Sequence, residues 1–221
     1  MYVQDLYQTT LFAFAQSSNN ARFANDFYDA INDAQKEFIN TRKWGFLRTT
    51  GTVNTIDGTR YVTLPTDFGN FYGGANTVRL TSPSTSVGRI VEVITFDQYY
   101  NQFYTNTTDE GEPSYCWIQA GLLYFEPIPD AVYAVAFPYY KRATAVTTTA
   151  DPLTIPEQYS EVLKKMVYRR LMAYNKDAIA DLQTSDNDVE KLMNRAARDD
   201  IATYGGFNMN LDPDTVTSRY T

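Results

Sequence analysis

The first forty residues carry apolar side chains at intervals of three or four, which is the spacing of one face of an α-helix. A first helix is predicted with its apolar face at Val3, Leu6, Tyr7, Leu11 and Phe14. A second, longer helix follows an N-cap at Asn19 or Asn20, and its apolar face carries Phe23, Phe27, Ile31, Ala34 and Phe38. It ends near Trp44-Gly45, where the period falls to two and predicts a β-region.

The β-region opens with a predicted hairpin. Val53 and Val62 flank Asp57-Gly58, a pair that tolerates the positive φ angles of a type I′ turn, so the two valines are expected to face each other. Further strands are predicted at residues 77–81, 89–94, 114–119, 122–125 and 131–139. Pro138 places the end of the last strand at a sheet edge, because proline donates no ladder hydrogen bond.

A short helix is predicted between two of these strands. Thr95 and Gln98 have the spacing of a capping box, in which each side chain bonds the backbone N–H of the other residue. Tyr99, Tyr100 and Phe103 follow at helical spacing. We expect this short amphipathic helix to pack against the sheet.

Two further helices are predicted towards the end of the chain. Pro156 opens the first, at a position where its missing N–H costs nothing, and the apolar face carries Tyr159, Val162, Leu163, Met166, Val167, Leu171 and Tyr174. The second helix stops at Gly205-Gly206, and its apolar face carries Val189, Leu192, Met193, Ala196, Ala197, Ile201 and Tyr204.

This order of elements predicts an α+β fold. Residues 1–47 and 153–205 are expected to form a discontinuous helical domain, with the N- and C-terminal helices packed in one layer. Residues 48–152 are expected to form a central antiparallel β-sandwich or small barrel with the embedded short helix. Residues 206–221 are polar and are expected to form an extended C-terminal tail without a core of its own.

Composition removes several classes of function. The 221 residues include 26 acidic and 19 basic side chains, for a net charge of −7, with no histidine and a single cysteine, Cys116. An intrachain disulfide, a multi-cysteine metal site and histidine-based catalysis are therefore excluded. The clustered Lys and Arg of a DNA-binding surface are missing. No apolar run is long enough to span a membrane, and the chain is expected to stay in the cytoplasm where it is made.

Two groups of carboxylates are candidates for chemistry. Asp109, Glu110 and Glu112 crowd one loop, where they could hold Ca²⁺ or act as an acid/base pair, although ordinary loops are also polar. Asp186, Asp188 and Glu190 alternate as metal ligands do, but their place at the predicted start of a helix favours an interaction with the helix dipole. We assign no cofactor, metal or catalytic residue.

Two charges interrupt the apolar faces of the last two helices. Arg170 and Asp200 each stand within the apolar stripe of their own helix, where an unpaired charge is costly. In an antiparallel helix pair the two lie at opposite ends, so each needs a different partner. We hypothesise that these partners lie on a neighbouring copy of the chain; the alternative is that Arg170 extends along its own stem to water.

Aromatic residues are abundant, at 15 % of the chain. Tyrosine suits interfaces that are wet before assembly, and it also suits a sheet with one solvated face. A carbohydrate-binding β-sandwich would expose residues such as Tyr99, Tyr100 and Trp117. A carboxylate-based hydrolase would depend on Asp109 and Glu112.

An ordered set of short motifs resembles a known family. The motifs are Trp44-Gly45-Phe46-Leu47, Leu64-Pro65-Thr66-Asp67-Phe68, Gly111-Glu112-Pro113-Ser114-Tyr115, Leu123-Tyr124-Phe125-Glu126-Pro127-Ile128-Pro129, Tyr139-Tyr140-Lys141 and Ile155-Pro156-Glu157-Gln158-Tyr159. Together they resemble the head-to-tail adaptor, or connector, proteins of tailed bacteriophages, of which the podophage tail tubular protein A is one type. The resemblance covers roughly residues 30–175.

The resemblance implies a virion structural protein without enzymatic activity. Such adaptors commonly form a ring of about twelve copies between the portal protein and a distal tail protein, a nozzle or stopper, and double-stranded DNA passes through the ring without specific binding. Assembly would take place in the host cytoplasm. The C-terminal tail lies outside the matched region, and we hypothesise from its low apolar content that it orders on docking to the portal or to an adjacent copy. The candidate interface residues are Arg170, Asp200, Tyr159, Tyr174, Tyr204, Phe207 and Tyr220.

Overall fold

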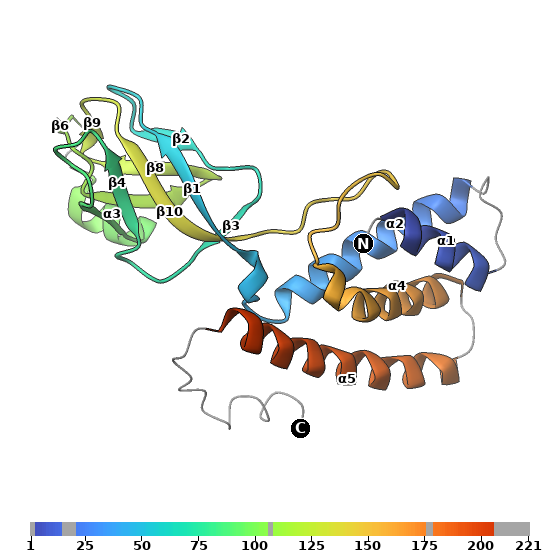
Figure 1. Cartoon of the computed structure of the whole chain (residues 1–221). Helices are drawn as coiled ribbons and strands as arrows, with labels where there is room; N and C mark the ends of the chain where they lie inside the picture. Colours follow the sequence, from blue (N-terminus) through green and yellow to red (C-terminus); the bar gives the residue numbers. More distant parts are fainter. Residues whose placement is uncertain (1–2, 15–20, 106–107, 176–178, 206–221) are drawn as a thin grey trace. The chain divides into compact units, whose positions relative to one another are not determined.

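The computed structural model describes residues 3–14, 21–105, 108–175 and 179–205. Apart from one short helix embedded among the strands, helices and strands occupy separate parts of the chain, which confirms the predicted α+β class (Figure 1). Contacts divide the chain into two compact units. The helical unit comprises residues 1–46 and 143–221, as far as they are described, and the β-unit comprises residues 47–142.

In its described residues the helical unit contains four α-helices, with α4 packed against both α2 and α5. Their bounds are α1 (Val3–Ala13), α2 (Ala21–Asn40), α4 (Ser160–Asn175) and α5 (Ile179–Tyr204). The predicted apolar face of α2 is buried, and Pro156 precedes the short 3₁₀-helix η2 (Glu157–Tyr159) that leads into α4. The expected N-cap at Asn19 or Asn20 lies outside the described residues.

The last helix begins earlier than its apolar pattern indicated. Because α5 starts at Ile179, Asp186 and Asp188 lie within the helix, and the interpretation that they interact with its N-terminal dipole is wrong. Their carboxylates instead pair across to α4, with Arg169 at 2.9 Å and Lys165 at 3.5 Å. The two aspartates of α5 are therefore explained by their basic partners on α4 and not by the start of a helix.

Residues 143–152 were expected to belong to the β-domain, but they pack on the helices. Val146 is buried, and its backbone N–H and C=O both bond the side-chain amide of Asn32 in α2, at 2.7 and 2.8 Å. A turn follows, in which the carboxylate of Asp151 accepts the backbone N–H groups of Thr147 and Thr148. This segment is therefore part of the helical unit.

The β-unit contains one curled sheet and a small pair of strands. The strands of the curled sheet, in spatial order, are β1 (Arg48–Asn54), β10 (Ala134–Lys141), β4 (Val78–Ser82), β5 (Ile90–Val93), β7 (Tyr115–Gln119), β8 (Leu122–Glu126) and β2 (Tyr61–Thr63), with β3 (Phe68–Phe71) also beside β10. The terminal strands β1 and β2 approach each other without pairing, so the sheet is a half-open barrel. The separate pair is β6 (Glu110–Gly111) with β9 (Ile128–Pro129).

The predicted hairpin has its turn but not its strand pairing. Ile56 and Thr59 form an isolated bridge around the turn, where Gly58 has φ +69°. Asp57 does not share a positive φ, so the turn is not type I′. Beyond it the strands separate, and Val53 faces Val135 in β10 rather than Val62. The prediction that the two valines face each other is therefore wrong.

Pro138 also lies in a different place from the predicted sheet edge. It stands within β10, which has β1 on one side and β4 and β3 on the other. Its C=O accepts the N–H of Tyr72, and it lies opposite Thr50 of β1. At Pro138 the backbone N position of β10 faces away from β1, towards the stretch where the partner of β10 changes from β4 to β3. Proline therefore costs no hydrogen bond of the sheet there.

The embedded helix α3 (Phe96–Phe103) is confirmed, including its capping box. The Thr95 hydroxyl accepts the N–H of Gln98 at 3.2 Å, and the Gln98 side chain accepts the N–H of Thr95 at 2.8 Å. The connection through α3 makes β5 and β7 parallel neighbours, a departure from the expected antiparallel pairing. The ring of Tyr99 stacks on Trp117 of β7 at 3.9 Å, which fixes the helix on the sheet.

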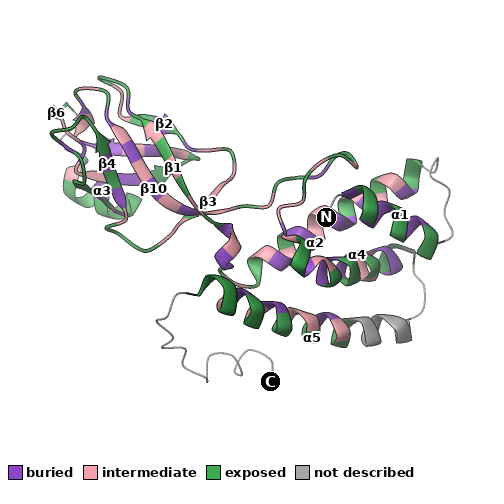
Figure 2. Cartoon of the chain, in the orientation of Figure 1, coloured by how far each residue is buried: buried purple, intermediate pink, exposed green. Residues whose placement is uncertain are grey.

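The core of the β-unit lies inside the curl of the sheet. Along β10 the side chains of Val135, Phe137 and Tyr139 are buried while their neighbours are partly exposed, as the banding in Figure 2 shows. Leu80, Leu123 and other apolar residues from the facing strands complete this core. Among the described helices, none is long and apolar enough to cross a membrane.

Candidate interaction surfaces

A cluster of ion pairs joins α2, α4 and α5. Arg170 reaches back to α2, where its guanidinium lies 2.6 Å from Glu37 and 3.7 Å from Asp33. Arg169 donates two hydrogen bonds to Glu37, at 2.8 and 2.9 Å, and a third to Asp186 at 2.9 Å. The charge of Arg170 is thus balanced within the chain, which removes the reason for seeking its partner on a neighbouring copy.

The electrostatics of this cluster favour its ionised form. Burial alone would raise the pKa of Glu37, but the hydrogen bonds and positive charges of Arg169 and Arg170 outweigh burial and lower it. Burial would lower the pKa of Arg169, and its bonds to Glu37 and Asp186 raise it instead. A carboxylate held ionised between two guanidinium groups is suited to fixing helices together rather than to proton transfer.

Asp200 has a different role, as a buried acceptor for backbone. Its side chain is 3 % exposed, and its two carboxylate oxygens accept the N–H of Gly45 at 3.0 and 2.8 Å. A Cβ at Gly45 would collide with the Cβ of Tyr204, so glycine is required for the approach of α5. Asp200 was expected to need a partner on a neighbouring copy. It instead holds the end of α5 against Gly45 of the same chain.

The aromatic candidates for an interface fall into three groups. Tyr159 is buried between Trp44 and Phe46, whose ring centroids lie 5.7 and 5.5 Å away, and burial raises its pKa. Tyr174 on α4 and Tyr204 on α5 are exposed. Phe207 and Tyr220 lie outside the described residues.

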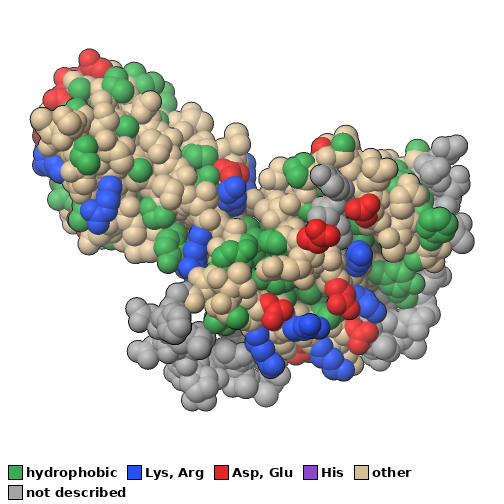
Figure 3. Space-filling view, in the orientation of Figure 1, with side chains coloured by type: hydrophobic (Ala, Val, Ile, Leu, Met, Phe, Trp, Pro, Cys, Tyr) green, Lys and Arg blue, Asp and Glu red, His purple; other side chains and the backbone are tan. Residues whose placement is uncertain are grey.

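The helical unit also has a shallow cavity of about 330 Å³ beside the ion pairs. Trp44, Met166, Val189 and Met193 give it an apolar wall, and Glu37 stands among its polar residues. On the visible face of this unit, acidic and basic side chains are interspersed rather than gathered by sign (Figure 3). The helical unit thus presents a mixed surface without a strongly charged patch on that face.

The acidic loop of the β-unit is tied into structure. Glu112 accepts hydrogen bonds from Arg89 at 2.8 Å and from the hydroxyl of Ser86 at 2.9 Å, while Glu110 belongs to the short strand β6. Asp109 is exposed beside them. Within the described part of the chain, no group of three or more acidic or cysteine side chains is placed to hold a metal ion.

The aromatic residues considered for carbohydrate binding are largely inaccessible. Tyr99 and Trp117 bury their faces against each other, and the Tyr99 hydroxyl accepts a hydrogen bond from Arg60 at 2.8 Å. Tyr100 points to solvent. Two of the three candidate rings, Tyr99 and Trp117, are therefore buried and are not available to a sugar.

The outer face of α3 carries an aromatic stripe that sequence analysis did not single out. Phe96, Tyr100 and Tyr104 follow one another at intervals of four, and each is between 42 and 55 % exposed. Neighbouring rings lie 6.1 and 4.5 Å apart. The four-residue spacing was available in the sequence, but only the packing of Tyr99 inwards shows that this second face is left to solvent.

Arg170, Asp200 and Glu112 are thus bound by groups of the same chain, while the aromatic stripe of α3 is exposed to solvent. The chain belongs to the SU10 adaptor protein family, whose model matches residues 3–211 and so spans both units. No curated protein matches the sequence. The family match confirms the resemblance to phage head-to-tail adaptors, and the protein is accordingly a phage structural adaptor.

Proposed function

We propose that the protein forms a closed ring between the portal vertex and the tail of the virion. The ring contains about twelve copies. One side binds the portal protein and the other side binds a distal tail protein, a nozzle or stopper. The ring assembles in the host cytoplasm and remains in the neck of the virion.

The observation that carries this proposal is the family match over residues 3–211, which includes the helical unit and the β-unit together. A ring requires two unlike surfaces on each copy, because head-to-tail contacts join different patches. The aromatic stripe of α3 supports this reading as one such patch, since exposed tyrosine and phenylalanine bury large area on assembly. We assign the stripe Phe96, Tyr100 and Tyr104 to a contact between protein subunits.

The negative charge of the chain supports a passive DNA channel. Each copy carries −7, so a ring of about twelve carries on the order of −80. Part of this charge lines the channel and repels the phosphate backbone, which lets double-stranded DNA slide without adhering. A ring structure with a channel wall dominated by Lys and Arg would contradict this assignment.

The test is negative-stain electron microscopy of the full chain with and without the purified portal protein. The proposal expects rings stacked coaxially on portals, with a copy number given by native mass spectrometry. The portal is included because a ring that forms only on its template would be missed in free protein. Absence of ring density on portals at saturating protein would overturn the proposal.

A variant pair tests the aromatic stripe separately. Tyr100→Asp places a charge in the stripe, and Gln102→Asp places the same charge on another exposed face of α3. Only the first substitution is expected to prevent assembly, while both retain the circular dichroism of the native chain. Equal assembly by the two variants would remove α3 from the contact.

A further inference from the structure

The strand β1 is paired along one side only. All seven of its residues have partners in β10, from Arg48 opposite Tyr140 to Asn54 opposite Ala134, in one unbroken register. Its other side is one end of the sheet. A seven-residue strand without a bulge is a long edge for a sheet of this size.

The register shows which backbone groups are unsatisfied. The N–H of Thr55 bonds the C=O of Tyr133, its opposite residue, so odd-numbered residues of β1 bond β10 in the alternation of an antiparallel pair. The even-numbered residues therefore direct their N–H and C=O away from β10. In the described part of the chain no hydrogen bond reaches Thr50 or Thr52 from that side.

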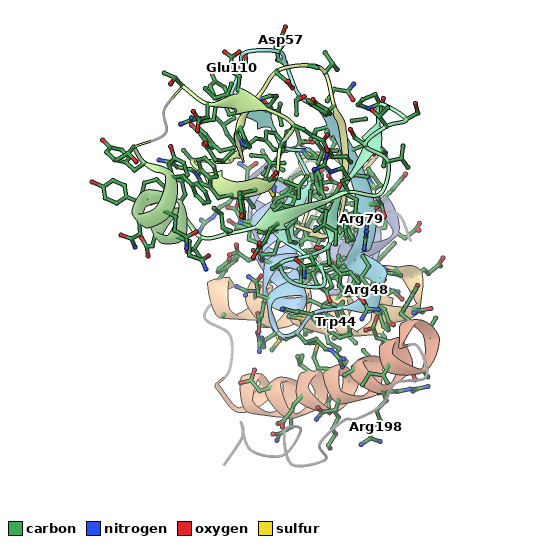
Figure 4. All side chains as sticks on the ribbon, turned by 90° about the vertical axis from the view of Figure 1, so that its left-hand side faces the viewer. Trp44, Arg48, Asp57, Arg79, Glu110 and Arg198 are labelled. Atoms are coloured by element: carbon green, nitrogen blue, oxygen red, sulfur yellow. The ribbon has the colours of Figure 1, made fainter. Side chains whose placement is uncertain are left out.

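This edge lacks the devices that natural sheets use against unwanted pairing. After Arg48 the strand continues Thr-Thr-Gly-Thr-Val-Asn, with no charge, proline or bulge. Such an edge is a template for another strand and is retained where a strand is meant to bind. Figure 4 places Arg48 at one end of the strand and Asp57 at the turn beyond its other end.

The space beside β1 is open and is lined by both apolar and polar residues. Between the two ends of the curled sheet lies a hollow of about 400 Å³, lined by residues of β1, β2 and the turn that joins them. Ile56 and Tyr61 face solvent there, 58 and 47 % exposed. A strand added to β1 would lie over this hollow and bring these side chains out of water.

We infer that the edge of β1 receives the C-terminal segment 215–221 of a neighbouring copy in the ring. This segment reads Thr-Val-Thr-Ser-Arg-Tyr-Thr, which matches β1 in length, lacks glycine and proline, and is rich in residues with high strand propensity. In an added strand Val216 and Tyr220 fall on the same face and pack over Ile56 and Tyr61. The inference rests on the proposed ring and specifies one contact within it.

The place where the tail leaves the helical unit makes this exchange geometrically accessible. The end of α5 is held at Gly45 by Asp200, and β1 begins three residues after Gly45. Residues 206–214 form a nine-residue spacer that spans about 30 Å when extended. That length is comparable with the width of a domain of about 100 residues, which is the span that the segment has to cross if each copy is to give one strand and receive one.

The first experiment measures amide hydrogen exchange of the full chain in rings assembled on portals. We expect the amides of Thr50 and Thr52 to exchange about tenfold or more slowly in the ring than in the free chain. Thr50→Pro/Thr52→Pro removes both outward N–H groups, and Thr50→Val/Thr52→Val keeps them with side chains of similar shape. Assembly is expected to fail, or to weaken at least tenfold, only in the proline variant.

A crosslinking experiment identifies the source of the strand. Copies carrying Thr52→Cys are mixed with copies carrying a cysteine at Thr217, Ser218 or Arg219 and are oxidised on portals. The native Cys116 does not compete, because it is buried and burial raises its pKa to about 12. A covalent dimer in one of the three mixtures is the expected result.

The outcomes separate this inference from the proposed function. Rings that form without exchange protection or without a covalent dimer overturn the strand exchange and leave the ring standing. When both cysteines are placed in one chain, an intrachain disulfide as the sole product overturns the exchange between copies. In that case β1 pairs with the tail of its own chain. Portals without rings overturn both proposals together.

Discussion

Substituting Asp200 tests how the end of α5 is anchored. The buried carboxylate accepts the N–H of Gly45 with both oxygens, and Gly45 is itself buried. A hydrogen bond to a charged group contributes about 1.5–3 kcal/mol, and its loss leaves a buried donor unpaired. Relief from burying a charge offsets part of this. We therefore expect Asp200→Ala to lower the free energy of unfolding of the helical unit by about 2 kcal/mol.

Urea denaturation followed by far-ultraviolet circular dichroism gives this difference, because nearly all described helix belongs to the helical unit. In thermal unfolding the same change lowers the midpoint by roughly 4–8 °C. Asp199→Ala is the matched control, since Asp199 is the adjacent residue on the same helix and is exposed. It should change stability by less than about 0.5 kcal/mol.

Hydrogen exchange adds a local readout of the same contact. The amide of Gly45 should exchange faster in Asp200→Ala than in the native chain, whereas Asp199→Ala should leave it unchanged. Equal stability and equal Gly45 exchange in the two variants would refute the anchoring role. Asp200→Asn keeps one acceptor oxygen without the charge and should fall between the two, at about 1 kcal/mol.

Three further predictions address the remaining contacts. The lowered pKa of Glu37 stabilises the native state above the carboxyl's unfolded pKa of about 4.3. In urea titrations the native chain should therefore be more stable than Glu37→Gln by a constant amount near neutrality, and this difference should disappear as pH falls below about 4. A difference that is independent of pH would contradict this. The backbone N–H groups of Thr147 and Thr148 lower the pKa of Asp151 to about 2, which carbon-detected NMR titration should reproduce, and an ordinary value near 3.9 would count against the turn. Tyr99→Ala should destabilise the β-unit by about 3 kcal/mol in denaturant unfolding followed by tryptophan fluorescence, because it removes a buried ring. Tyr100→Ala removes an exposed ring and should have an effect below about 0.5 kcal/mol, so similar losses would refute the different burial of the two rings.

Local patterns in the sequence were sufficient for the elements that local physics determines. The faces of α2 and α4 followed from apolar spacing, because a helix must bury one stripe. The start of α3 followed from Thr95 and Gln98, whose mutual bonds need no distant partner. The fold class then followed from the order of these elements along the chain.

Strand pairing could not be predicted in the same way. Asp57-Gly58 gives a tight turn, but the partners of β1 and β2 come from β10 and β8, about sixty to ninety residues later. A turn fixes the direction of two strands only when no more distant strand competes for their edges. The unpaired edge of β1 could not be predicted for the same reason. Which strands lie at the ends of a sheet depends on all of the strand pairings together.

The charged positions show a second limit of sequence patterns. Arg170 and Asp200 were correctly recognised as charges within apolar stripes, but their partners, Glu37 and the backbone of Gly45, lie more than one hundred residues away. A carboxylate on one helix and a guanidinium on another leave no spacing signature, because their approach depends on how the helices pack. Backbone acceptor sites are harder still to find, because every residue except proline carries the same N–H.

The pairing of Arg48 with Tyr140 has a consequence for modularity. These residues stand at the entry to and exit from the β-unit, and opposite residues in such a pair have Cα atoms about 4.5–5.5 Å apart. The two ends of almost one hundred inserted residues therefore lie as close together as the ends of a very short loop. Connecting the folded insert to the helical unit costs little loop-closure entropy. A compact module of a different fold but with equally close ends could replace this insert without straining α2 or the segment that leads into α4.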